Sequence, residues 1–306
     1  MAKFNGKKSA MRRRCTMSLP KKILEEKLRK IVEEDVGHGD ITTSHIVSRG
    51  TTVDAQVMAK EKGKIAGLEE ATVLAESFGL KTKPLAADGQ KVQEKTLILQ
   101  LEGDAATLLS IERTLLNLLS RMSGIATATN LLVERIRKAG YQTRVASTRK
   151  VAPGLAYFDK KAVMIGGGDS HRWGLDDMIL IKDNHVVIAG GIAEAVERVR
   201  KNVSFSKKIE VETARLDDVL EAAQSGVDIV MLDNFTPKQV KEAVRLLRKR
   251  QLRAKLLVEA SGGITEHNIL EYAAAGVDIV SLGEITHSAR ALDVSLEITK
   301  VKKPHR

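Results

Sequence analysis

The stretch GVDIVMLDNFT (226–236) decides the fold, because the chain repeats it almost unchanged as GVDIVSLGEIT (276–286). A weaker copy, DDMILIKDN (176–184), follows the same pattern of apolar and polar residues. Each copy keeps a short apolar run and then changes the residue that ends it, which is in turn Lys182, Asp233 and Gly283. A repeat of this kind predicts one structural unit used several times, with a constant buried part and a variable end.

From about residue 143 onward, short apolar runs alternate with amphipathic helical segments. The candidate strands are TRVAS (143–147), MILIK (178–182), KIEVE (208–212), DIVML (228–232), KLLVE (255–259) and DIVSL (278–282), with AVMIG (162–166) as a candidate seventh. Continuously apolar runs between helices are typical of parallel strands covered by helices. We therefore expect an α/β fold with a parallel (β/α) barrel, incomplete at six or seven strands. A doubly wound open sheet is the alternative.

The chain before this region has a different pattern. VDAQVMAK, GKIAGL and TLILQLEG, between residues 52 and 103, are predicted strands, and LEEATVLAESFG is a predicted helix that ends at Gly79. Asp104 is expected to cap a long helix that runs to Gly124, and a second amphipathic helix is expected to end at Gly140. The change of pattern predicts a smaller α/β part before the barrel.

Composition and charge narrow the class of protein. The 306 residues are 43% hydrophobic and 29% charged, which suits a globular protein with a sizeable core and excludes a disordered one. Of the net charge of +11, residues 1–17 supply six positive charges and no negative one, leaving +5 for the remaining 289 residues. This tail is an arm for nucleic acid or membrane, a short organelle transit peptide, or an extension that is either disordered or lies upstream of a true start at Met11 or Met17. The last interpretation is favoured.

The cysteine content and the hydropathy of the chain bear on its cellular compartment. The single cysteine, Cys15, excludes an intramolecular disulfide and suits a reducing environment. No run of about eighteen apolar residues is present, and the tail lacks the apolar segment of a secretory signal. We therefore expect a soluble, cytoplasmic protein.

Polar residues gather where the predicted strands end, and in a parallel barrel these ends meet at one rim. They are Thr148, Arg149, Lys150, Lys182, Glu212, Asp233, Ser261, Gly262, Gly263 and Gly283, joined by Gly166, Gly167, Gly168, His171 and Arg172 from the loop before 178–182. The cations predict a site for a polyanion. Glu212 and Asp233 suit a hydrated Mg²⁺ or sugar hydroxyls, and the late glycine loops suit phosphate. Each feature alone also fits a solvated loop, a rim ion pair or a turn, but their convergence favours the site.

Eight stretches of the chain resemble the quinolinate phosphoribosyltransferases, the decarboxylating nicotinate-nucleotide pyrophosphorylases also called type II phosphoribosyltransferases. They are DVGHGDITT (35–43), IERTLLNLLSRMSGIATAT (111–129), TRKVAPGL (148–155), KKAVMIGGGDSHRWGLDDMILIKDNH (160–185), IEVET (209–213), DIVMLDNF (228–235), VEASGGI (258–264) and SLGEITHS (281–288). The resemblance covers nearly everything from about residue 18. It implies an N-terminal α/β sandwich (18–112) joined by a returning segment (289–306), and an incomplete barrel with the active site (113–288). The basic residues 1–17 precede these parts and are expected to form a disordered tail.

The resemblance also implies an activity. A pentosyltransferase of this family transfers the phosphoribosyl group of phosphoribosyl pyrophosphate to quinolinate, giving nicotinate mononucleotide, pyrophosphate and CO₂ in NAD biosynthesis, with Mg²⁺. The resemblance places in the quinolinate pocket the residues Arg149, Lys150, His171, Arg172 and Lys182, and Thr148 is expected to be a further substrate-binding residue. It implies a homodimer or a dimer-based oligomer in which Arg113 reaches the neighbouring subunit's site. Glu212 and Asp233 would face the ribose and the metal, directly or through water, and would act in catalysis with Lys150 and Lys182. The phosphate end would be lined by Ser261, Gly262, Gly263, Leu282, Gly283 and Glu284.

The chain departs from the family pattern at three positions near the site. Ser147 stands where the family often has an acid, Val151 stands where Thr is common, and Trp173 is an unusual bulky neighbour of Arg172, either packed or acting as a lid. A related branch linked to molybdenum uptake shares much of the pattern, but the intact IKDNH (181–185) favours the quinolinate branch. A phosphosugar lyase or isomerase would not need so many cations. A nucleic-acid-binding protein is disfavoured by 3% aromatic content and no known motif, and no membrane partner is expected.

Overall fold

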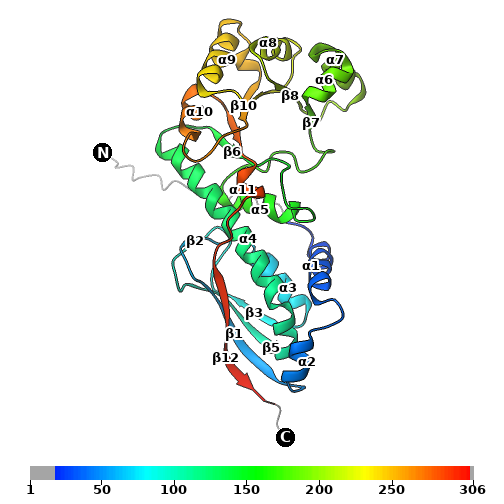
Figure 1. Cartoon of the computed structure of the whole chain (residues 1–306), viewed down its shortest axis with the longest axis vertical. Helices are drawn as coiled ribbons and strands as arrows, with labels where there is room; N and C mark the ends of the chain where they lie inside the picture. Colours follow the sequence, from blue (N-terminus) through cyan, green and yellow to red (C-terminus); the bar gives the residue numbers. More distant parts are fainter. Residues whose placement is uncertain (1–17, 304–306) are drawn as a thin grey trace, which may run out of the picture.

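The computed structural model describes residues 18–303, so the basic tail, Cys15 and both candidate start codons lie outside the described part of the chain. The molecule is elongated, with a parallel barrel at one end and an antiparallel sheet at the other (Figure 1). The long helix α4 (Ala105–Lys138) runs from the antiparallel sheet into the barrel. This helix links the two parts of the structure.

The antiparallel sheet has four strands in the order β12–β1–β5–β3, namely β12 (Val294–Lys302), β1 (Thr52–Ala59), β5 (Leu97–Asp104) and β3 (Lys81–Pro84). Every second residue of β1 is buried, as expected for a strand with one face on the core. A short ribbon, β2 (Gly63–Lys64) with β4 (Lys91–Val92), lies beside it. The helices of this part, which pack with α4, are α1 (Lys21–Val36), α2 (Ile41–Ile46) and α3 (Leu68–Ser77).

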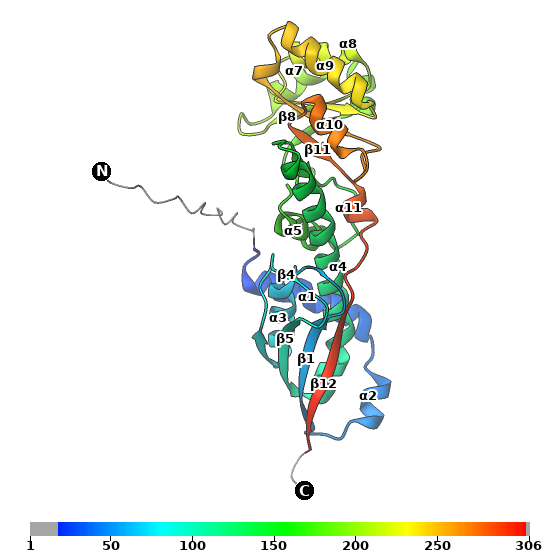
Figure 2. The ribbon, with the colours of Figure 1, turned by 90° about the vertical axis from the view of Figure 1, so that its left-hand side faces the viewer.

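The C-terminal segment returns to this sheet after the barrel. Figure 2 shows the chain descending from α11 (Glu284–His287) alongside α4 to β12. β12 pairs with β1 along its whole length, from Ala59 opposite Val294 to Thr52 opposite Lys302. Strands far apart in sequence therefore complete one sheet.

Helix α4 corrects the prediction of two separate helices that meet at Gly124. Asp104 caps its start, and the Asp104 carboxylate accepts a hydrogen bond from the Thr107 backbone N–H at 2.8 Å. Gly124 does not end the helix, because it serves a close approach: a Cβ there would collide with the carbonyl oxygen of Arg290 in the returning segment. No helix of residues 18–303, α4 included, is long and apolar enough to cross a membrane.

The second sheet has six parallel strands in the order β6–β11–β10–β9–β8–β7. They are β6 (Arg144–Ala146), β7 (Ile179–Ile181), β8 (Ile209–Thr213), β9 (Ile229–Asp233), β10 (Leu257–Ser261) and β11 (Ile279–Ser281). The order follows the chain from β7 round to β11 and then β6, without the reversal that marks a doubly wound sheet. Within the described chain β6 and β7 do not pair, so the barrel is open there. The predicted fold class is confirmed.

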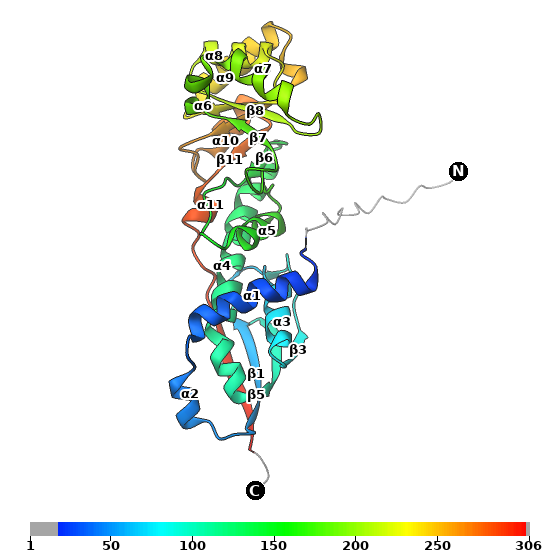
Figure 3. The same ribbon diagram turned by 90° about the vertical axis from the view of Figure 1, so that its right-hand side faces the viewer.

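Helices cover the outside of this sheet (Figure 3). They are α6 (Asp183–Ala189), α7 (Ile192–Asn202), α8 (Leu216–Gln224), α9 (Pro237–Lys249), the 3₁₀ turn η1 (Arg253–Lys255) and α10 (Ile269–Ala275). Helix α9 shows why these segments are helical. Thr236 and Gln239 form a capping box at its start, and residues at helical spacing, Val240, Val244 and Leu247, are buried.

The candidate seventh strand, 162–166, was wrong: these residues form the last part of helix α5 (Ala156–Gly166). Helix α5 packs against α4 and is buried on most of its surface, including Ala162, Val163 and Ile165. A helix that is buried nearly all round can end in a short apolar run like that of a buried strand, although α5 also buries Asp159, Lys160 and Lys161. Gly167, with a φ of 98°, ends it in the left-handed conformation that favours glycine.

Candidate active site

The register of the parallel strands brings their carboxyl ends together. Ser261 of β10 pairs with Asp233 of β9 on one side and with Ser281 of β11 on the other. A cavity of about 810 Å³ opens at this rim. Its lining includes nearly all of the predicted site residues, namely Thr148, Arg149, Lys150, His171, Arg172, Lys182, Glu212, Asp233, Ser261, Gly262, Gly263, Leu282, Gly283 and Glu284. Gly166, Gly167 and Gly168 instead shape the turn after α5.

Arg113 is the exception. It lies on the exposed surface of the first half of α4, beside the antiparallel sheet, and does not line the cavity of its own chain. Figure 1 shows how far the start of α4 lies from the barrel strands. Any role of Arg113 in catalysis therefore requires a second subunit.

One side of the cavity carries cations that lack acidic partners. Arg149 and Lys150 are exposed in the β6–α5 loop, and Arg172 is buried in the loop before β7. No carboxylate of the described chain lies within ion-pair distance of these three side chains. Burial lowers the pKa of Arg172, and repulsion from Arg149 lowers it further. An anionic ligand would relieve this repulsion, so the geometry favours one.

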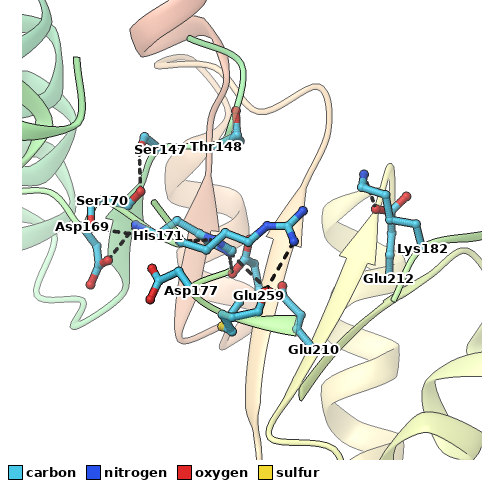
Figure 4. A network of polar contacts seen from close by, with 12 residues as sticks. Ser147, Thr148, Asp169, Ser170, His171, Asp177, Lys182, Glu210, Glu212 and Glu259 are labelled. Atoms are coloured by element: carbon cyan, nitrogen blue, oxygen red, sulfur yellow. Dashed lines mark hydrogen bonds and ion pairs between the residues drawn. The ribbon is translucent and has the colours of Figure 1, made fainter. Parts of the chain in front are cut away.

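His171 points into the barrel interior, where Glu210 of β8 and Glu259 of β10 face it (Figure 4). Its Nε2 lies 3.4 Å from a Glu210 oxygen and 3.3 Å from a Glu259 oxygen, and both glutamates are fully buried. Burial by itself lowers the pKa of His171, but these two carboxylates outweigh it and raise the pKa to about 10. Burial also raises the pKa of Glu210, to about 7. The three side chains form a buried, proton-holding cluster beneath the cavity.

The residue types of this cluster would also suit a metal ion. However, the backbone N–H of Arg172 donates to Nδ1 of His171 at 2.8 Å. Nε2 is the nitrogen that faces both carboxylates, which favour a proton there. Without a metal this proton is donated toward the two carboxylates, and the cluster then helps to hold the His171 loop in place.

The other side of the cavity carries two acids. Nζ of Lys182 lies 3.0 Å from a Glu212 oxygen, and the Asn234 side chain donates to Asp233 at 2.7 Å. Burial raises the pKa of Asp233, and the neighbouring charge of Glu212 raises it further. Lys182 forms an ion pair with Glu212 but with no oxygen of Asp233 in the described chain, so the two carboxylates have the charge and the oxygen donors to accept a hydrated divalent cation.

A glycine turn follows β10 and closes the same side. Gly262 and Gly263 have φ values of 88° and 61°, in the left-handed region. A Cβ on Gly262 would also collide with the Asn234 side chain and lie 3.0 Å from the Asn234 backbone nitrogen. A Cβ on Gly263 would meet nothing within 4 Å. The two glycines therefore differ in packing but share the same backbone conformation.

This difference gives a test of the turn. We expect Gly262→Ala to raise the KM for the phosphorylated substrate by about tenfold, because backbone strain of about 1–2 kcal/mol adds to the collision with Asn234. Gly263→Ala, which carries the strain alone, should raise it less. Steady-state kinetics of both variants measure the difference, and equal effects would show that the contact with Asn234 does not matter.

Some residues of the site escaped the sequence analysis. Glu210 and Glu259 lie inside predicted strands, two positions before the inward-facing Glu212 and Ser261. A charged residue at an inward position of an apolar strand was the available signal, because alternate residues share a face. Trp173 does not line the cavity, and its ring lies against Tyr157 with the ring centres 6.4 Å apart, so it packs rather than covering the site.

Comparison with known proteins agrees with this geometry. Models of the quinolinate phosphoribosyl transferase N-terminal and C-terminal domains match residues 40–123 and 125–297. A Methanothermobacter thermautotrophicus protein named "probable nicotinate-nucleotide pyrophosphorylase (carboxylating)" is 47% identical over 90% of this chain and 99% of its own length. The human nicotinate-nucleotide pyrophosphorylase (carboxylating) is 36% identical over 85% of this chain and 89% of its own.

A solved structure gives the same result. The nicotinate-nucleotide pyrophosphorylase from Francisella tularensis superposes with a TM-score of 0.83 at 36% identity, covering 92% of this chain and 98% of its own. Fold, cavity and sequence therefore agree, and the chain belongs to the quinolinate phosphoribosyltransferase family.

Proposed function

We propose that this protein transfers the phosphoribosyl group of phosphoribosyl pyrophosphate to quinolinate, with loss of CO₂, to form nicotinate mononucleotide and pyrophosphate in NAD biosynthesis. The observation that carries the proposal is the set of cations on one wall of an 810 Å³ cavity, Arg149, Lys150 and Arg172, none of which forms an ion pair within residues 18–303. Opposite this wall lie the acids and the glycine turn. Few substrate pairs need both surfaces at once.

The basic wall suits quinolinate, which carries two adjacent carboxylates. Arg149 and Arg172 present planar guanidinium groups that bind a carboxylate through two hydrogen bonds, which a lysine cannot do. Lys150 and Lys182 provide point charges that orient the carboxylate to be lost. Nicotinate has only one carboxylate and would leave part of this charge unmatched.

The acidic wall suits the ribose and the pyrophosphate of the second substrate. Glu212 and Asp233 would hold Mg²⁺, directly or through water. Their carboxylate oxygens suit this ion, and a cation would relieve the repulsion between their charges. When bound, Mg²⁺ would neutralise charge on the leaving pyrophosphate. The backbone N–H groups of the turns at Gly262 and Gly283 would bind the phosphate ends.

The reaction follows from this arrangement. The bond between C1 of the ribose and the pyrophosphate oxygen breaks, and the pyrophosphate takes the bonding electrons. Glu212 and Asp233 stabilise the oxocarbenium-like centre that develops at C1. The pyridine nitrogen then forms the new bond to C1, and the ring becomes cationic. The 2-carboxylate leaves as CO₂, and its bonding electrons stay on the ring carbon, which then takes a proton.

We further propose that the active unit is a cytoplasmic homodimer. The exposed position of Arg113, remote from the cavity of its own chain, supports a contribution to the partner's site. A third arginine, beside Arg149 and Arg172, would complete the recognition of a dicarboxylate.

An activity assay tests the proposed function. Purified protein with quinolinate, phosphoribosyl pyrophosphate and Mg²⁺ should form nicotinate mononucleotide, and replacing quinolinate with nicotinate or removing Mg²⁺ with EDTA should abolish turnover. Turnover with nicotinate, or none with quinolinate from a folded dimer, would contradict the proposal.

A further inference from the structure

Lys160, on α5, is a fully buried lysine that lies beneath two loops of the site. Its Nζ donates hydrogen bonds to the carbonyl oxygens of Thr148, at 3.1 Å, and Ser170, at 2.6 Å. Thr148 directly precedes the pair 149–150, and Ser170 directly precedes the pair 171–172. One ammonium group therefore joins the two loops that carry the basic wall of the cavity.

We infer that Lys160 is a positioning residue for quinolinate, and that its ammonium group sets the spacing between the Arg149 loop and the Arg172 loop. The identity of the ligand rests on the proposed function, whereas the link between the loops rests on the geometry alone. Lys160 does not line the cavity, so it acts through the loops and does not touch the substrate.

The open side of the barrel explains why such a link is needed. The two loops belong to β6 and β7, which do not pair within residues 18–303, so no strand ladder holds them in register. Beside β6 the two loops are joined by a short bridge between Ala146 and Asp169 and by the hydrogen bond from Ser147 Oγ to the Ser170 carbonyl oxygen. Arg149 and Arg172 also repel each other across the gap. The two hydrogen bonds from Lys160 oppose this repulsion and keep both guanidinium groups in place for one ligand.

The next residue, Lys161, provides a comparison within the same helix. It is also buried, but its Nζ pairs with Glu69, at 2.5 Å, and Glu70, at 2.6 Å, both on α3. Adjacent helical residues point about 100° apart, so the two lysines face different parts of the molecule. Lys161 fastens the barrel to the antiparallel domain, and Lys160 fastens the substrate loops.

The surroundings of Lys160 give it a titration that can be observed. Its pKa is lowered to about 8, mainly by burial. Arg149 and Arg172 contribute to this decrease, whereas Asp177 and Asp169 oppose it. Its two acceptors are uncharged carbonyls, so deprotonation weakens both hydrogen bonds. Quinolinate binding should therefore weaken above pH 8.

Stability should respond in the opposite direction. A lysine in the unfolded chain keeps its proton up to about pH 10.4. Between pH 8 and that value the unfolded state binds more protons than the folded state at this position, so the contribution of Lys160 to stability rises with pH. Loss of quinolinate affinity above pH 8 would thus not arise from unfolding caused by this group.

Ser147 allows the charge on Lys160 to be adjusted. Its Oγ donates to the carbonyl oxygen of Ser170 at 2.8 Å, the same oxygen that accepts from Lys160, as Figure 4 shows for Ser147. An aspartate at position 147 would therefore stand beside the ammonium group. An adjacent carboxylate raises the pKa of a lysine, so Ser147→Asp should move the loss of quinolinate affinity to higher pH.

The main experiment compares Lys160→Met with Lys161→Met/Glu70→Gln, which removes both partners of the neighbouring buried pair. We expect Lys160→Met to raise the KM for quinolinate by about tenfold or more, because small displacements of binding groups have large effects. The KM for phosphoribosyl pyrophosphate should change little, since the two carbonyls that Lys160 holds belong to the loops of the basic wall and not to Glu212, Asp233 or the glycine turn. The double variant should lower thermal stability but leave the KM for quinolinate within about twofold.

A spectroscopic readout makes the test independent of turnover. Trp173 is the single tryptophan, it adjoins Arg172, and it lies in the loop held through Ser170. Its fluorescence emission in the ligand-free protein should shift between wild type and Lys160→Met. The double variant does not serve as the control for this readout, because Lys161 and Glu70 both contact Tyr157, against which Trp173 packs. If wild-type protein fails to turn over quinolinate, the proposed function fails, while this comparison still tests the link between the loops.

Two outcomes would overturn the inference. One is unchanged Trp173 emission together with a normal KM for quinolinate in folded Lys160→Met. The other applies if Lys160→Met does not fold. The test is then Ser147→Asp: if its quinolinate affinity depends on pH in the same way as that of the wild type, the charge of Lys160 has no role in binding.

Discussion

Replacing Arg149 with alanine is expected to lower kcat/KM for quinolinate by about 10²–10³-fold, the equivalent of about 3–4 kcal/mol of lost transition-state binding. Arg149 is exposed to the cavity, has no acidic partner in the described chain, and repels the buried Arg172. Its charge is therefore not used within the protein and is available to a substrate carboxylate. Most of the loss should appear as a higher KM for quinolinate, with kcat also reduced because the ring is no longer oriented.

Two further variants separate charge, geometry and general effects. Arg149→Lys keeps the charge but loses the planar fork, so it should recover only part of the activity. Arg144→Ala is the matched control: Arg144 is also exposed, but it begins β6 and lies outside the lining of the cavity. It should leave both KM values unchanged. Near-normal kinetics in Arg149→Ala would remove this residue from the quinolinate pocket.

The barrel was predictable from sequence because its strands repeat. Each unit must supply the same buried face, so the apolar runs recur, and all six were found within two residues of their true bounds. The prediction of a strand at 162–166 was wrong because the last part of α5 is apolar and buried, which the sequence alone does not distinguish from a buried strand. The predicted helix end at Gly124 was wrong because this glycine instead allows the backbone at Arg290 to approach the helix. Nothing in the local sequence shows this contact.

The sequence predicted the residues that line the cavity but not the residues that support them. Residues that directly follow strands, such as Lys182 and Asp233, are visible in sequence because the register of a parallel sheet carries them to one rim. The residues that support them are not. Lys160 reaches one carbonyl in the loop before α5 and one in the loop after it, and Glu259 meets His171 across the barrel interior. Such contacts depend on how separate elements pack, which periodicity does not encode.

The position of Arg113 leads to the second large effect. If Arg113 completes the partner's site, Arg113→Ala should lose activity as severely as Arg149→Ala, although Arg113 does not line the cavity of its own chain. The two inactive variants would then carry different defects. In a mixed dimer, one site would combine both defects, while the other would combine an intact cavity with an intact Arg113.

Mixing the two variants therefore distinguishes a contribution in trans from a structural defect. After subunits of Arg113→Ala and Arg149→Ala are exchanged in equal amounts, half of the dimers are mixed and each has one intact site, so about a quarter of wild-type activity should return. The recovered sites should show the wild-type KM for quinolinate, because all of their residues are native. Each variant incubated alone under the same conditions is the control. If the mixture stays inactive although exchange is verified with differently tagged subunits, Arg113 does not act across a dimer interface, and its loss of activity must arise within its own chain.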